Sequence, residues 1–362
     1  MTNQLLYRKI EETIRERIEN GTYPPGSQLP TEMELIKEFN TSRLTISKSL
    51  SHLVAEGLIS RTRGRGSFVK GEKIRETPGL IRFISPVAKD ESYLLHNGLL
   101  EGIQEIVRQA NYNVSIDFYR TVEDEIELIR QYQNRENDAF VIWPCNDPAV
   151  IEMLRELDRN RFPFVLVDSF FPQFKSDCVM TDNILGGQLM LEYLFKQGHK
   201  HVGYLSQELN RFSLAERFAG TVSAAGMFGI ELLSHVLICR SGDPARQKEN
   251  IARWLDEQSD LPEPPTAIFC SNDSLAVMLY EVLAVKEVKV PDDMSVAGFD
   301  NASFGQYLPV PLTSVEHDFY GIGRKAGQLL LKRLQKEQAN SEFLQYRLSP
   351  RLHCRASVAE KK

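Results

Sequence analysis

The 362-residue sequence has few cysteines, no membrane-spanning run and none of the short motifs that mark common enzyme classes. Its five cysteines, at positions 145, 178, 239, 270 and 354, include no C-x-x-C pair, which argues against disulfides and against a zinc site. No apolar run is long enough to cross a bilayer, and the polar N-terminus does not resemble a signal peptide. G-x-S-x-G, H-E-x-x-H and phosphate-loop motifs are missing. These absences predict a cytoplasmic protein that is not an enzyme and needs no metal or other cofactor.

Charge is distributed unevenly along the chain. The whole sequence carries a formal net charge of −6, yet residues 1–71 hold 11 Lys and Arg against 8 Asp and Glu. The start of the chain is therefore mildly basic and the remainder is acidic. This distribution is typical of a protein that binds nucleic acid through its head alone.

The stretch from Thr41 to Gly57 has the pattern of a short capped helix. Ser42 is a capping residue, apolar residues then recur at helical spacing, and Gly57 is a typical helix end. The expected buried stripe consists of Ile46, Leu50, Leu53 and Val54. The same spacing predicts that Leu44, Thr45 and Lys48 face outwards.

A glycine-rich basic connector follows this helix. It joins two short β-prone runs, 58–60 and 67–69, and carries Arg61, Arg63 and Arg65. Such a connector is too charged for a core and fits a hairpin tip that lays guanidinium groups against phosphates or into a groove. A solvated loop is the alternative for the arginines alone. Because the capped helix, the glycine and the basic hairpin coincide, residues 1–70 are predicted to form a winged helix-turn-helix DNA-binding module.

The preceding residues complete a family pattern. An amphipathic helix is expected near the N-terminus, and Thr31 with Glu34 forms a capping box at the start of a second helix. The runs G-x-x-P-P-G-S-Q-L-P-T-E-x-E-L, S-R-x-T-I, E-G-L-I and R-G-R-G-S-F-V, within residues 5–70, resemble the winged-helix head of the GntR family of bacterial regulators.

This resemblance implies which head residues touch double-stranded DNA. Ser47 stands where the family usually has an arginine that reads a guanine, with Lys48 beside it. The predicted DNA-binding residues are Glu32, Arg43, Thr45, Ser47, Lys48, Arg61, Arg63 and Arg65.

Beyond a charged linker at 71–79, β-prone runs alternate with helical patterns. Strands are expected at 81–84, 114–118, 139–143, 164–167, 202–205, 236–238, 267–270 and 295–299. The alternation predicts parallel sheets with right-handed crossovers. About ten such units exceed one typical sheet, so residues 80–362 are expected to form two similar α/β lobes.

Polar and aromatic residues stand where several of these strands end. Trp143 ends F-V-I-W, Asp168 ends F-V-L-V-D, Asn272 follows A-I-F-C-S and Asp300 ends S-V-A-G-F-D. Ligands of open parallel sheets bind at the carboxyl ends of the strands. Carboxylates and amides bridge neighbouring hydroxyls and an aromatic ring covers the apolar face of a sugar, so these residues predict a polyhydroxylated ligand.

Residues 80–357 resemble the effector-binding core of the LacI family, which is related to periplasmic sugar-binding proteins of type I. The resemblance is carried by G-H-x-x-V-G-Y-L at 198–205, S-L-A-E-R-F-A-G at 213–220, P-T-A-I-F-C-S-N-D-S-L-A at 265–276 and V-P-D-D-M-S-V-A-G-F-D at 290–300. Many members have glutamine at the position of His317 and tryptophan at that of Pro244. The implied ligand-binding residues are Asp168, Ser213, Arg217, Asn272, Asp300 and His317, with a looser match at His96 and Trp143.

Several of these residues also have a structural interpretation. Arg217 is open to a role as an ion-pair partner, His317 to one as a satisfied core histidine, and Trp143 to core packing. Asp273 and Asp182 are both expected to cap helices rather than to bind ligand.

A GntR-type head on a LacI-type core resembles the arabinose repressor subfamily of bacteria. The resemblance implies a homodimeric repressor that leaves its operator when a monosaccharide, a pentose or deoxyhexose, binds. Two alternatives stay open. One is a carbohydrate-processing enzyme that uses Asp168 and Asp300 as acid and base, and the other is a sugar sensor whose head binds protein rather than DNA.

Overall fold

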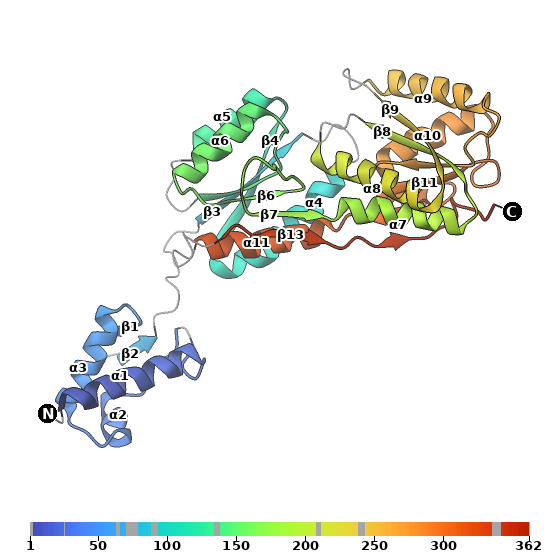
Figure 1. Cartoon of the computed structure of the whole chain (residues 1–362). Coiled ribbons are helices and arrows are strands. Elements are labelled where there is room, and N and C mark those ends of the chain that lie inside the picture. The colour runs from blue at the N-terminus through green and yellow to red at the C-terminus, as the bar shows by residue number, and fades with distance from the viewer. Residues whose placement is uncertain are drawn as a thin grey trace. The chain divides into compact units, whose positions relative to one another are not determined.

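The computed structural model describes residues 3–24, 26–62, 66–69, 79–87, 93–133, 138–207, 211–237, 243–334 and 342–361. The chain divides into two compact units, Met1–Thr77 and Pro78–Lys362, which are described separately (Figure 1). The finer boundaries of 1–70 for the head, 71–79 for the linker and 80–362 for the core stay predictions. Arg63 and Arg65 of the predicted DNA-binding set lie outside the described residues.

The first unit is a winged helix-turn-helix. Its elements are α1 (Asn3–Glu19), α2 (Glu32–Glu38), α3 (Arg43–Ala55), β1 (Ile59–Thr62) and β2 (Gly66–Val69). The two strands pair in an antiparallel hairpin. Apolar side chains from all five elements share one core, in which the predicted α3 residues Ile46, Leu50 and Leu53 are fully buried.

Local capping determines where α2 and α3 begin. The Thr31 hydroxyl accepts a hydrogen bond from the Glu34 amide (3.3 Å) and the Glu34 carboxylate accepts one from the Thr31 amide (2.7 Å), which confirms the capping box. The Ser42 hydroxyl likewise accepts a bond from the Thr45 amide (3.3 Å). Leu44 is exposed as predicted, but the outward orientation predicted for Thr45 is wrong. Thr45 is 8% exposed because its hydroxyl lies 2.9 Å from that of Ser42 and is drawn into the cap.

The second unit contains two six-stranded sheets with equivalent strand orders, β13-β7-β6-β5-β3-β4 and β14-β12-β11-β10-β8-β9. Neighbouring strands are parallel except for the antiparallel pair β12 and β14. The first sheet comprises β3 (Gly79–Pro86), β4 (Tyr112–Tyr119), β5 (Asp138–Ile142), β6 (Phe164–Val167), β7 (Cys178–Thr181) and β13 (Gln345–Leu348). The second comprises β8 (His201–Gln207), β9 (Glu231–Leu237), β10 (Ala267–Cys270), β11 (Ser295–Asp300), β12 (Thr313–Glu316) and β14 (Leu352–His353).

Helices cover both faces of each sheet (Figure 1). In lobe 1, built on the first sheet, α4 (Tyr93–Val107) and α11 (Phe319–Leu334) pack opposite α5 (Val122–Tyr132) and α6 (Pro148–Arg159). In lobe 2, α7 (Asn183–Lys196) and α8 (Phe212–Phe228) pack opposite α9 (Pro244–Ser259) and α10 (Asp273–Val285). Short 3-10 helices lie at η1 (Arg108–Ala110) and η2 (Ser303–Tyr307). This is the predicted pair of doubly wound α/β lobes.

One strand prediction is wrong in its extent. Residues 236 and 237 of the run expected at 236–238 belong to β9, which already begins at Glu231, and residue 238 lies outside the described residues. Ser234 and His235 interrupt the apolar pattern in E-L-L-S-H-V-L, so the hydrophobic signal starts late although the backbone pairs with β8 along its whole length.

Two glycines set how closely α8 approaches α7. A Cβ at Gly220 would lie 2.1 Å from the Ile184 carbonyl oxygen, and one at Gly187 would lie 2.5 Å from the Arg217 carbonyl oxygen. Since α8 carries Ser213 and Arg217, this backbone contact positions two of the predicted ligand-binding side chains.

We expect Gly220→Ala to lower the free energy of unfolding by about 1–3 kcal/mol, the usual cost of overpacking. The matched control is Gly226→Ala, because no heavy atom lies within 4 Å of a Cβ at Gly226 on the same helix. Alanine there should be neutral or stabilising by up to about 1 kcal/mol. Urea denaturation measures both variants, and equal stabilities would contradict the close packing of α7 and α8.

Candidate functional site

Several of the predicted ligand-binding residues meet where the two lobes join. Asp168 follows β6 in lobe 1, Arg217 lies on α8 and Asp300 ends β11 in lobe 2, while His317 stands on the connection from β12 to α11, one of the passages between the lobes. Asp168 and Asp300 have φ angles of 49° and 108°, which non-glycine residues seldom adopt. Such backbone conformations are typical of functional sites.

Arg217 is the centre of a buried polar network. Its side chain donates hydrogen bonds to Asn183 Oδ1 (2.8 Å), to the Ser271 carbonyl oxygen (2.7 Å) and to His317 Nδ1 (2.9 Å). The guanidinium also lies 3.2 Å from Asp300 Oδ1. Arg217 is 3% exposed, so each of these contacts is shielded from water. The guanidinium thus joins four segments that are far apart in the sequence.

The contact with Arg217 determines the tautomer of His317. A guanidinium can only donate, so Nδ1 accepts and the ring proton of a neutral imidazole sits on Nε2. This nitrogen lies 3.3 Å from Asp168 Oδ1. The Ser213 hydroxyl donates to the other oxygen, Asp168 Oδ2 (3.2 Å). Asp168 of lobe 1 is therefore linked both to the crossover and to α8 of lobe 2.

Burial and charge oppose each other in this pair. Burial alone would lower the pKa of His317, but the Asp168 carboxylate, helped by Asp300, holds that pKa above its ordinary value. Burial alone would raise the pKa of Asp168, but His317 and Arg217 hold it below its ordinary value. Their alignment still leaves His317 Nε2 and Asp168 Oδ1 without a hydrogen bond among the described residues. A hydroxyl group can pair with both atoms.

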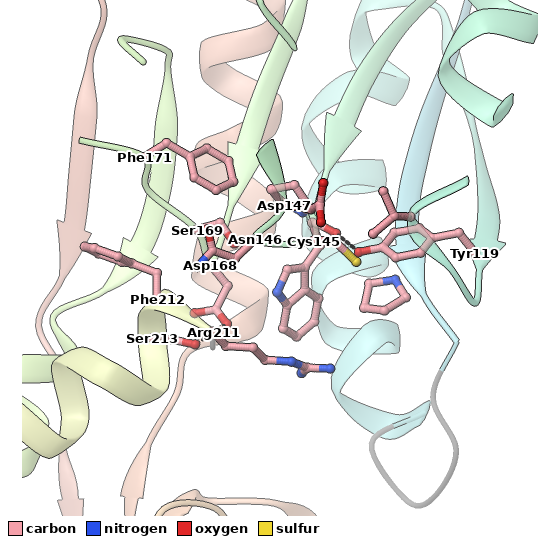
Figure 2. Close-up of a pocket in the computed structure, with 14 residues that line it drawn as sticks. Tyr119, Cys145, Asn146, Asp147, Asp168, Ser169, Phe171, Arg211, Phe212 and Ser213 are labelled. Atoms are coloured by element: carbon pink, nitrogen blue, oxygen red, sulfur yellow. Dashed lines mark hydrogen bonds between the residues drawn. The ribbon is translucent and has the colours of Figure 1, made fainter. Parts of the chain in front are cut away.

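A cavity of about 330 Å³ begins at Asp168 and Ser213 (Figure 2). Figure 2 shows these two side chains next to one another, with Tyr119 and Cys145 across the cavity. The aromatic lining consists of Tyr119, Trp143, Phe171 and Phe212, and the polar lining includes Asn146, Asp147, Asp168, Arg211 and Ser213. The combination of rings and hydrogen-bonding groups suits a small polar ligand with an apolar face.

The predicted ligand-binding residues do not all lie in this cavity. Trp143, Asp168 and Ser213 line it. Arg217, Asp300 and His317 belong to the adjoining network. His96 lies on α4, but its side chain is outside the described part of the structure. Whether each residue binds ligand stays a prediction.

Two capping predictions have different outcomes. Asp182 caps α7 as expected, since its carboxylate accepts a bond from the Leu185 amide (3.0 Å). The cap predicted at Asp273 is wrong, because Asn272 caps α10 by accepting from the Leu275 amide (2.8 Å). Asp273 is instead buried and accepts bonds from the Ala302 amide and the Ser314 hydroxyl, both at 2.7 Å.

Sequence reasoning missed most of the cavity lining, including the aromatic residues Tyr119, Phe171 and Phe212 and the charged residues Asp147 and Arg211. Asp147 lies in the segment after β5 and Arg211 in the segment between β8 and α8. Both segments follow the carboxyl end of a strand beside the point where the strand order reverses. The rule that pointed to Asp168 and Asp300 applies equally to them.

The described residues contain one group with metal-ligating spacing, His201, Glu231 and Glu263. Glu231 lies 3.4 Å from His201 Nδ1, whereas Glu263 lies 2.7 Å from Nε2. The two ring nitrogens point in different directions, so a single ion cannot take the imidazole and both carboxylates in these positions. Ion pairing around His201 accounts for the group.

In the head, Glu32 gathers two cations of the predicted DNA-binding surface. Its carboxylate lies 3.2 Å from Arg43 Nε and also pairs with the Arg61 guanidinium. Arg61 further donates to the Ser47 hydroxyl at 3.5 Å. The Lys48 ammonium lies 4.3 Å from the centre of the Tyr7 ring. Glu32 therefore orients arginines from α3 and the wing, and contact with DNA stays a prediction for each residue.

Comparison with known proteins finds family matches for both the head and the core. Residues 6–69 match the family described as "Bacterial regulatory proteins, gntR family", and residues 191–358 match "Periplasmic binding protein-like domain". No helix among the described residues is both long and apolar enough to span a membrane.

One relative matches along almost the whole chain, and others match along two thirds or more of it. The chain is 25% identical to an arabinose metabolism transcriptional repressor of Halalkalibacterium halodurans, with 98% of this chain and 97% of that protein covered. It is 33% identical to the transcriptional repressor CytR of Escherichia coli K12, over 67% of this chain and 70% of that protein. A solved LacI family regulator from Enterococcus faecium, with bound ribose, has a TM-score of 0.64 and 26% identity, covering 78% of this chain and 100% of that one.

These relatives are transcriptional repressors and regulators, which favours the predicted regulator over the enzyme alternative. The chain therefore belongs to the family of bacterial transcriptional regulators that join a GntR-type winged-helix head to a periplasmic binding protein-like core of the LacI type.

Proposed function

We propose that this regulator is a cytoplasmic, homodimeric repressor that leaves its operator when a monosaccharide, a pentose or deoxyhexose, binds between its lobes. The observation that carries the proposal is the place where Asp168 of lobe 1 meets Ser213 of lobe 2 and His317 of the connection between the lobes, called the junction below. There Asp168 Oδ1 and His317 Nε2 lie 3.3 Å apart, and neither makes a hydrogen bond with any described residue; a cavity of about 330 Å³ lined by aromatic rings lies next to them. Sugar hydroxyls both donate and accept, so one sugar edge satisfies both atoms.

The position of the junction explains how a sugar would act on the head. Asp168 belongs to lobe 1 and Ser213 to lobe 2, so a ligand that bonds to both selects one arrangement of the lobes. A homodimer places two heads at the spacing of a pseudo-palindromic operator, and a change in that spacing weakens DNA binding. Coupling energies of about 1–3 kcal/mol are common, which corresponds to a weakening of operator affinity of about 5–150-fold.

The relatives guide the choice of sugar. One is named for arabinose metabolism and one solved neighbour holds ribose, both pentoses. A thermal-shift panel of arabinose, ribose, xylose, fucose and glucose should therefore show a rise in melting temperature with a pentose or deoxyhexose. A ligand at 100 times its Kd adds about 2.7 kcal/mol to the stability of the native state. No shift with any monosaccharide would contradict the proposal.

The same protein tests operator release. Binding sites selected from a pool of random duplexes provide the operator, and fluorescence anisotropy measures its affinity with and without the sugar that raised the melting temperature. We expect weaker operator binding in the presence of sugar, and an affinity that falls steeply with added salt as counterions are displaced. Absence of any duplex binding by the full chain would favour a head that binds protein instead.

A further inference from the structure

One wall of the cavity is a single loop whose backbone is hydrogen-bonded by two side chains of lobe 1. All five residues from 143 to 147 line the cavity. The Tyr119 hydroxyl donates to the Trp143 carbonyl oxygen (2.7 Å), and the Cys145 amide donates to Glu125 Oε2 (3.0 Å). The loop backbone is thus tied to β4 by Tyr119 and to α5 by Glu125. Its conformation decides the shape of the cavity.

Glu125 is an acidic residue that is fully buried where it accepts the hydrogen bond from the loop. It is 0% exposed, and no lysine or arginine forms an ion pair with it in the described part of the chain. Its second oxygen, Oε1, is buried without a hydrogen-bond partner among the same residues. A buried carboxylate without a cation is costly, whereas a protonated carboxyl group is tolerated.

We propose that Glu125 is a positioning residue of the effector cavity: as a neutral carboxylic acid it holds the 143–147 loop in its binding shape, and loss of its proton weakens effector binding. This inference rests on the proposed function in so far as the cavity binds the effector. Glu125 does not line the cavity itself, so it acts through the Cys145 amide.

Burial of Glu125 places the loss of its proton near pH 8. Burial raises the pKa of Glu125 to about 8, against the hydrogen bond from Cys145, and the Asp147 carboxylate adds to the rise. Burial also raises the pKa of Cys145, to about 11, and that of Tyr119, with the Arg211 guanidinium opposing both shifts. Among Tyr119, Glu125 and Cys145, Glu125 is the group that changes charge near pH 8.

Deprotonation acts on binding through linkage. The anion has no cation to pair with among the described residues of lobe 1, so its hydration requires the loop or α5 to move. A loop that has moved does not match the ligand. If the ligand binds only the protonated form, its Kd rises about tenfold from pH 7 to pH 9. The stability of the folded state should depend on pH in the same direction as ligand binding does. A pKa raised above 4.5 means that this group's contribution to stability is full below about pH 4.5 and is lost as pH rises towards 8.

The test compares four full-length proteins by isothermal titration with arabinose and ribose at pH 7 and pH 9. The wild type should lose about tenfold in affinity at pH 9. Glu125→Gln keeps an acceptor for the Cys145 amide without a charge, so it should bind equally at both pH values. Glu125→Ala removes the acceptor and should bind several-fold more weakly at both. Glu123→Gln, at an exposed position on the same helix, should keep the wild-type pH profile.

A second readout needs no sugar. Trp143 is 9% exposed and is two residues from the Glu125 contact, so its fluorescence should change with a midpoint near pH 8 in the wild type and not in Glu125→Gln. A pH step that persists in Glu125→Gln, or full affinity in Glu125→Ala, would overturn the inference. Failure of every protein to bind either sugar would count against the proposed function instead, and the fluorescence titration would still decide the role of Glu125.

Discussion

Replacing Arg217 with methionine is expected to leave operator binding intact and to abolish its response to sugar. The substitution removes the donor to Asn183, Ser271 and His317 and leaves the largely buried Asp300 carboxylate without its guanidinium partner. Losing one partner of a buried pair costs about 3–5 kcal/mol. We also expect sugar affinity to fall by at least about 100-fold, since the orientations of both His317 and Asp300 depend on the guanidinium.

Loss of stability and loss of sugar recognition can be separated at this site. Arg217→Met combined with Asp300→Asn removes the orphaned charge, so the double variant should recover part of the melting temperature without recovering the sugar response. Arg217→Lys keeps the charge but not the planar set of N–H donors, so its melting temperature and sugar response should lie between those of the wild type and the methionine variant. Operator anisotropy with and without sugar, beside thermal melts, measures all three variants. A methionine variant that still releases DNA on addition of sugar would make Arg217 a purely structural residue.

The sequence predicted those features that depend on neighbouring residues. The capping box of Thr31 and Glu34 and the cap at Ser42 are complete within four positions, and the structure has both. The buried stripe of α3 follows from helical spacing alone. The error at Thr45 arose because spacing describes a regular helix, whereas Thr45 lies in the first turn, where the cap draws its side chain inwards.

Contacts between distant segments were beyond such reasoning. The partners of Arg217 come from positions 183, 271, 300 and 317, and no local pattern shows that they converge. The exact start of α10 was also not predictable, because Asn272 and Asp273 are both suitable capping residues. In the structure α10 starts after Asn272, which caps it, and Asp273 is buried. Glu125 has the sequence context of an ordinary helix surface, V-E-D-E-I, and only the folded structure places it behind the cavity.

The head offers a matching pair of charges at the predicted DNA surface. The Arg43 side chain is 82% exposed on the first turn of α3, and that of Arg61 is 35% exposed on the first strand of the wing. Both lie against Glu32, which keeps two long side chains in defined positions before any DNA arrives. Ordering them in advance reduces the entropy lost on binding.

We therefore expect the double variant Arg43→Ala and Arg61→Ala to weaken operator binding by about 100-fold or more, since one good base or phosphate contact is worth about 1–3 kcal/mol. Each lost phosphate contact should also reduce the slope of log affinity against log salt by about 0.9. The control is Arg130→Ala, which removes an exposed arginine from α5 in the other unit. Anisotropy over a series of salt concentrations measures affinity and slope together, and the sugar-induced rise in melting temperature of the core should be unchanged. An equal loss in Arg130→Ala would mean that general charge, rather than the surface around Glu32, attracts the duplex.

If Glu32 serves only to orient the two arginines, Glu32→Gln should cost less than the double variant and leave the salt slope unchanged, because both cations remain available to the phosphates.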